Sequence, residues 1–317
     1  MRKAVLILLA FLLSGLPVWA YPPVYIEKAE AIPDLCQNDR SARLPGRGKG
    51  YCGPVAVSNS FVYLSQKGFP ALLPSMGRRK MTQGQLASLL GMSRYMNTSI
   101  KDGTTPAGLL LGVENFLKDR GVNWSYLGYQ GWRKHPDEFS ADSTAPVIGW
   151  IKDGLLGDSA VWLNLGWYKR DEKTGEYLRI GGHWVTLVGY GLNEKGARDP
   201  MSLLIHDPAT RPPKQASATA PAEAAPLTPQ TASCPADFEA PCQTDYVRLV
   251  PLGKGTLRAE EGGHVIDAKD FYRLDGVRSM DPAASIAVMD GAVVLKLKKM
   301  ETLLLTRENP ESLSLLQ

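Results

Sequence analysis

The sequence predicts an α+β fold in which helices come first and strands follow. Between about residues 53 and 120, apolar residues recur at helical spacing, and Gly and Pro mark the breaks between segments. After about residue 144, short runs of apolar, β-branched and aromatic residues replace that pattern. Helices followed by a run of strands are typical of an α+β domain with an antiparallel sheet.

Three helices are expected in the first half of the chain. The first covers residues 53–66. The second begins at Thr82, whose spacing from Gln85 is that of a capping box. The third covers residues 107–120, where the apolar positions follow helical spacing, and Gly121 ends it.

Five strands are expected in the second half. They are apolar runs separated by turn-forming residues, at 146–151, 161–167, 183–190, 202–207 and 246–250. Residues 292–305 fit either a strand pair or a helix, and the sequence leaves both open.

The first 20 residues have the features of a secretory signal peptide. Arg2 and Lys3 precede an apolar run, and the small residues that end at Ala20 place cleavage before Tyr21. The run is too short to span a bilayer comfortably, although an uncleaved anchor is the alternative. No later segment is apolar enough to span. We therefore expect a secreted or periplasmic protein, with no membrane span once Met1 to Ala20 are removed.

Changes in composition divide the remaining chain. Residues 21–35 are expected to be irregular, and residues 36–250 are expected to form one domain. Within that domain, residues 208–233 are rich in Pro, Ala and Thr and are expected to be a disordered insertion. Residues 251–317 are expected to be a C-terminal extension of uncertain structure.

Net charge argues against two classes of partner. The formal net charge of +4 falls to +2 once Arg2 and Lys3 leave with the signal. A nearly neutral chain gives no reason to expect binding to nucleic acid or to a membrane surface.

The chain has four cysteines, which are Cys36, Cys52, Cys234 and Cys242. An oxidising compartment permits disulfides. Cys234 and Cys242 are close together in a Pro-rich stretch, so we expect them to pair. A second bridge between Cys36 and Cys52 is an open alternative, because an even count in an exported chain favours full pairing.

Cys52 is also the strongest candidate for a catalytic residue. It lies at the start of the first expected helix, where free backbone N–H groups and the positive end of the helix dipole favour a thiolate. The thiolate is the nucleophilic form of cysteine.

Two further residues complete a candidate catalytic triad. His183 begins a strand pattern and is the best candidate for the base, with Gly181 and Gly182 before it leaving room for close approach. Asp207 ends the next strand, where an antiparallel neighbour brings it beside His183 and lets its carboxylate orient the imidazole. The adjacent His206 points to the opposite face of the strand and is expected to be structural.

Further chemistry is less marked in the sequence. The backbone N–H of Cys52 is one expected oxyanion donor, and Gln37 is expected to supply the second. No short-range pair of ligands supports a metal site built from Cys52, His183 and Asp207.

The matching pieces of a known pattern are, in chain order, Tyr51-Cys52-Gly53-Pro54 with its apolar helix, Gly103-Thr104-Thr105-Pro106, Pro146-Val147-Ile148 on a strand, Gly182-His183-Trp184-Val185 with Gly189-Tyr190, and Asp207-Pro208. In this order they resemble the papain-like cysteine peptidases, and within them the C39-like group. The resemblance covers residues 36–208.

The resemblance implies a helical half packed on an antiparallel sheet, with the site between them. It implies thiol-dependent cleavage of a peptide or protein substrate and no cofactor. By position, Cys52 is the nucleophile, His183 the base and Asp207 its orienting residue. The family places its oxyanion glutamine a few residues before the cysteine, whereas residues 46–49 here contain none. Gln37 is then expected to fill the role through a longer loop.

Two alternatives to a peptidase or amidase remain open at this point. The first keeps the fold and uses an amine in place of water, which gives a transglutaminase-like acyltransferase. The second is a non-catalytic secreted binding domain in which Cys36 and Cys52 form a disulfide.

Overall fold

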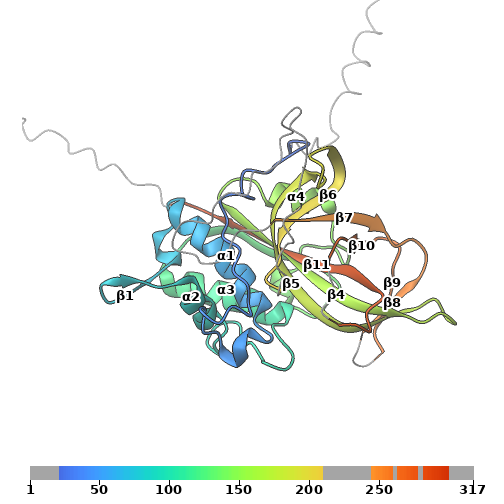
Figure 1. The fold of residues 1–317 in the computed structure, drawn as a ribbon, viewed down its shortest axis with the longest axis horizontal. Helices are drawn as coiled ribbons and strands as arrows, with labels where there is room; N and C mark the ends of the chain where they lie inside the picture. Colours follow the sequence, from blue (N-terminus) through green and yellow to red (C-terminus); the bar gives the residue numbers. More distant parts are fainter. Residues whose placement is uncertain (1–20, 210–243, 260–262, 278–280, 300–317) are drawn as a thin grey trace, which may run out of the picture.

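The structure is a computed structural model that describes residues 21–209, 244–259, 263–277 and 281–299 (Figure 1). The expected signal peptide, the expected Cys234–Cys242 disulfide and nearly all of the expected insertion at 208–233 lie outside the described residues. The described part is an α+β fold, as predicted.

Helices dominate the first part of the chain. They are α1 (Cys52–Gln66), α2 (Gln83–Leu90), α3 (Pro106–Arg120) and α4 (Ile148–Gly154), with 3-10 turns at Pro45–Gly48, Pro70–Leu72 and Asp137–Phe139. The three helices expected in the first half are confirmed. In Figure 1, α1, α2 and α3 lie together beside the sheet.

Local sequence signals set the ends of these helices. The capping box predicted at Thr82 is present, with its hydroxyl and the Gln85 side chain each bonded to the other residue's backbone N–H. The Thr105 hydroxyl caps α3 by accepting from the Gly108 N–H, and Gly121 ends that helix in a left-handed conformation at φ 61°.

Two separate sheets are present in the described ranges. A short hairpin joins β1 (Ser75–Met76) and β2 (Arg79–Lys80). The main sheet contains β3 (Trp124–Gly131), β4 (Ser159–Arg170), β5 (Tyr177–Leu192), β6 (Arg198–His206), β7 (Asp245–Pro251), β8 (Thr256–Arg258), β9 (Val265–Asp267), β10 (Tyr272–Asp275) and β11 (Ile286–Leu297).

Six strands of the main sheet close into a ring. The pairs are β4 with β5, β5 with β6, β6 with β7, β7 with β10, β10 with β11, and β11 with β4, all antiparallel. An apolar cluster draws members from all six strands, including Leu163, Val185, Leu203, Leu249, Leu274 and Met289. Alternate residues of β4 and β5, such as Trp162 and Trp184, pack instead with helices α1 and α3 in a second cluster.

The strand expected at residues 146–151 is wrong, because this segment forms helix α4 from Ile148 onward. A short apolar run does not by itself distinguish a strand from a buried helix. Here Ile151 and Leu155 are both fully buried at helical spacing, and Gly154 packs against Val294 of β11.

The expected division at residue 250 is also wrong. Strand β11 pairs with β3 on one side and with β4 on the other, so residues expected in a C-terminal extension form part of the main sheet. The segment from 292, left open between a strand pair and a helix, continues β11 to Leu297. Val293 and Val294 are buried on opposite faces of this strand, which explains its continuous apolar sequence.

Candidate active site

Cys52 is the first residue of α1, and this helix is fixed closely against the sheet. The Ala56 carbonyl accepts hydrogen bonds from Trp162 Nε1 at 3.1 Å and from the Thr186 hydroxyl at 2.9 Å. A Cβ atom on Gly53 would lie 2.9 Å from the Thr104 side chain, so glycine is required there for the close packing. These buried contacts fix the start of α1, which carries Cys52, against the sheet and the Thr104 loop.

The structure brings His183 and Asp207 together. His183 lies on β5, and Asp207 directly follows β6, its antiparallel neighbour. Nε2 of His183 donates to Oδ1 of Asp207 over 2.6 Å. The same oxygen accepts from the Ala209 N–H at 2.8 Å, which holds the carboxylate in place.

Cys52 and Asp207 both influence the charge state of His183. Burial lowers the pKa of His183, but attraction and a hydrogen bond from Asp207, together with a hydrogen bond and attraction from Cys52, raise it to about 10. Nδ1 of the ring is buried and has no hydrogen-bond partner within the described residues.

Trp167 and Thr104 lie close to His183 and Cys52, although the sequence predicts no role for either residue. The Trp167 indole stacks on the His183 ring, with centroids 5.9 Å apart and planes 22° apart. The Thr104 carbonyl accepts from Trp184 Nε1 at 2.8 Å, which ties the residue after His183 to the loop that packs on Gly53. The Gly103-Thr104-Thr105-Pro106 motif therefore connects the cysteine helix to the histidine strand.

Gln37 lies beside the loop that leads to Cys52. Its Nε2 donates to the Gly48 carbonyl at 3.1 Å, and its backbone N–H donates to the Pro208 carbonyl at 2.8 Å. Gly48 has φ +82°, and a side chain there would clash with the Gln37 carbonyl. A glutamine that is distant in the sequence is thus buried between the approach to Cys52 and the residue after Asp207.

The alternative disulfide between Cys36 and Cys52 is contradicted, because both are free thiols. Cys36 is partly exposed, and its sulfur lies 3.8 Å from the Ala209 carbonyl. Cys52 is therefore not bridged to Cys36.

His206 has the structural position expected for it. It is fully buried, and its ring nitrogens lie 3.4 Å from the Pro33 carbonyl and 3.2 Å from the Thr244 hydroxyl. Within the described ranges, no group of three or more His, Cys, Asp or Glu side chains is arranged to hold a metal ion.

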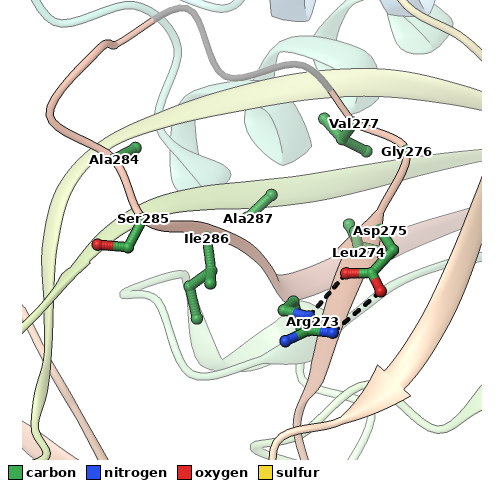
Figure 2. A pocket seen from close by; sticks show the side chains of 9 residues that line it. All are labelled: Arg273, Leu274, Asp275, Gly276, Val277, Ala284, Ser285, Ile286 and Ala287. Carbon is green, nitrogen blue, oxygen red and sulfur yellow. Dashed lines mark hydrogen bonds and ion pairs between the residues drawn. The ribbon is translucent and has the colours of Figure 1, made fainter.

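A cavity of about 310 Å³ lies between β10 and β11, away from the triad. Figure 2 shows it, with the Arg273 guanidinium paired to the Asp275 carboxylate at 2.6 Å on its wall. None of Cys52, His183 and Asp207 lines this cavity.

The chain matches no protein-family model, and no curated protein or solved structure is similar to it. In the part of the chain that the structure describes, no helix has the length and apolar character to cross a membrane.

Proposed function

We propose that this protein is a thiol-dependent hydrolase, a peptidase or amidase, in which Cys52, His183 and Asp207 form the catalytic triad. The observation that carries the proposal is a buried imidazole bonded to Asp207 through one nitrogen, with Cys52 near enough to help raise its pKa. A nucleophile, a base and an orienting carboxylate in this order are the parts that acyl transfer requires.

The geometry supports a two-step mechanism. The raised pKa of His183 means that the imidazole carries a proton at neutral pH. The attacking form of a cysteine is the thiolate, which a neighbouring imidazolium stabilises. The sulfur attacks a substrate carbonyl, and His183 gives its proton to the leaving amine as the C–N bond breaks. Water, deprotonated by the now neutral His183, then attacks the thioester and returns Cys52 as the leaving group.

The negative oxygen formed in each step needs donors. The first N–H groups of a helix have no acceptor within the helix, so the Cys52 N–H at the start of α1 is one natural donor. We assign the second to Gln37, since one of its two amide hydrogens is used by Gly48 and the other is left for a ligand.

The same proposal includes the family and the location of the protein. A helical layer against a mainly antiparallel sheet, in which only β5 and β8 are seen to pair in parallel among the described strands, supports a papain-like fold of the C39-like group, with Cys52 on a helix start and His183 on a strand. The charged start and apolar run of residues 1–20 support export to the periplasm or the medium. The substrate would be a peptide or protein.

Hydrolysis of a mixed peptide library, followed by mass spectrometry, tests the proposed activity. We expect cleavage by the native protein and loss of cleavage in Cys52→Ala, while the matched control Cys36→Ala keeps full activity. Full cleavage by Cys52→Ala would overturn the assignment. Adding a primary amine distinguishes the acyltransferase alternative, because that enzyme would yield an amide adduct in place of the free acid.

A further inference from the structure

Building on the proposed function, we propose that Arg179 is a positioning residue for His183. Its ion pair with Asp290 crosses strand β4 and fixes the bulge in β5 that aims the imidazole at Cys52. We call this pair the Arg179–Asp290 clamp.

The clamp is buried and satisfies its polar groups. Nε of Arg179 lies 2.7 Å from Oδ2 of Asp290, and the two side chains are 8% and 0% exposed. Oδ1 of Asp290 accepts from the Tyr168 hydroxyl at 2.5 Å and from Trp132 Nε1 at 3.0 Å. Three donors therefore converge on one carboxylate in the interior.

The clamp begins at a bulge in β5. Tyr168 of β4 pairs with Arg179, but the preceding Trp167 pairs with Gly181, so Ile180 is an extra residue in β5. A bulge bends its strand and changes the direction of the side chains that follow. His183 comes three residues after this one, so the bulge sets the path by which it reaches the site.

The clamp ends at a second bulge, on the opposite side of β4. Leu165 of β4 pairs with Met289, and Asn164 pairs with Gly291, so Asp290 is the extra residue in β11. The ion pair therefore joins the bulge in β5 to the bulge in β11, across β4. In this way it holds both strands in register with β4.

Two glycines make room for the clamp because they have no side chain. Gly166 and Gly182 face each other across β4 and β5. A Cβ atom on Gly166 would lie 2.5 Å from Oδ2 of Asp290, and one on Gly182 would clash with Nη2 of Arg179. Gly182 directly precedes His183, so the clamp lies against the backbone that carries the base.

A buried ion pair is a poor source of net stability, because desolvation of the charges offsets their attraction. In some proteins a buried pair of this kind specifies a single geometry instead. Here the geometry that it fixes is the bulge before His183.

The test compares Arg179→Met with a matched control, Arg258→Met. Arg258 pairs with Glu176 at 2.8 Å near the start of β5 and lies outside the site. For each folded variant we would measure kcat and KM, and also the pH dependence of Cys52 alkylation by iodoacetamide. We expect Arg179→Met to lower kcat by about tenfold or more with little change in KM, and to alter the alkylation profile. Arg258→Met is expected to leave both at native values.

A second variant, which keeps the Arg179 guanidinium, covers the case in which Arg179→Met does not fold. The Cβ atom added by Gly182→Ala would displace Nη2 of Arg179, while residue 182 itself is exposed. We expect this variant to change kcat and the alkylation profile in the same direction as Arg179→Met. Native kcat and a native profile in folded Arg179→Met, whatever its melting temperature, would overturn the proposal. If Arg179→Met does not fold, native behaviour of Gly182→Ala would do so. Activity that survives Cys52→Ala would instead refute the proposed function itself.

Discussion

Nε2 of His183 lies 2.6 Å from Oδ1 of Asp207, a residue 24 positions later that follows the neighbouring strand. The contact uses one ring nitrogen and leaves Nδ1 buried without a hydrogen-bond partner in the described residues. The imidazole is therefore fixed at Nε2, and Nδ1 is the nitrogen that the proposed mechanism uses to exchange a proton.

Replacement of Asp207 by Asn tests the orienting role. The amide keeps the shape of the side chain but removes the charge that supports the imidazolium. We expect kcat/KM to fall by about 10²-fold, with the helix and sheet content unchanged by circular dichroism. The exposed Asp275→Asn serves as the control. An Asp207→Asn variant with native kcat/KM contradicts the role.

Activity is expected to persist at alkaline pH. The pKa of His183 is raised to about 10, so the imidazolium is retained below that value and lost as pH rises through it. The pH profile of kcat/KM should accordingly decline near pH 10. In Asp207→Asn this alkaline decline should move to lower pH, because the attraction that raises the pKa is gone. An unchanged profile in the variant would refute this explanation.

Gln37→Ala tests the second oxyanion donor. Loss of one such donor typically reduces kcat by about 10²–10³-fold. Alkylation of Cys52 forms no oxyanion, so its rate should stay near native. Equal losses in catalysis and in alkylation would mean that Gln37 only shapes the loop at Gly48. Gln83→Ala, which removes a buried glutamine bonded to α1, is the matched control for packing.

The burial of Lys28 leads to a prediction about the stability of the protein and not about its activity. Its ammonium is buried and donates to the Leu155 carbonyl at 2.6 Å and to the Ser159 carbonyl and hydroxyl at 2.8 and 3.0 Å. Burial lowers its pKa to about 7, against the smaller opposing attraction of Asp158 and Glu27. Since the unfolded chain binds that proton up to about pH 10.5, this residue makes stability rise with pH between 7 and 10.5.

The contribution of His183 to the free energy of unfolding changes with pH in the opposite direction, over nearly the same pH range. Its stabilising effect is complete below the unfolded pKa of about 6.5 and is lost as pH rises through about 10. In the native protein the two contributions oppose each other. In Lys28→Met, therefore, the free energy of unfolding should fall as pH rises from 7 to 10, by up to about 1.4 kcal/mol per pH unit. Urea titrations at several pH values measure this, and a slope equal to that of the native protein would be the contrary result.

The sequence was most informative where chemistry and local geometry coincide. Cys52 at a helix start, His183 on a strand and Asp207 at a strand end were predicted because each has a local pattern of its own. Helix α3 was predicted because a threonine cap and a terminal glycine bound a clear helical period.

Features that depend on strand register were not predictable in this way. The place of β11 between β3 and β4 follows from pairings with segments more than 100 residues earlier. The bulges at Ile180 and Asp290 exist only as mismatches between two strands, so no single segment shows them. The contact between Trp167 and His183 was not predicted for the same reason, since this stacking depends on the register of β4 against β5.

The rate at which iodoacetamide alkylates Cys52, compared with Cys36 in the same unreduced native protein, tests the central claim most directly. If His183 activates the sulfur, Cys52 should react at neutral pH faster than expected for a buried thiol, and the rate should drop in His183→Ala while that of Cys36 does not change. A Cys52 that stays unlabelled, or that reacts equally fast with and without His183, would contradict the account.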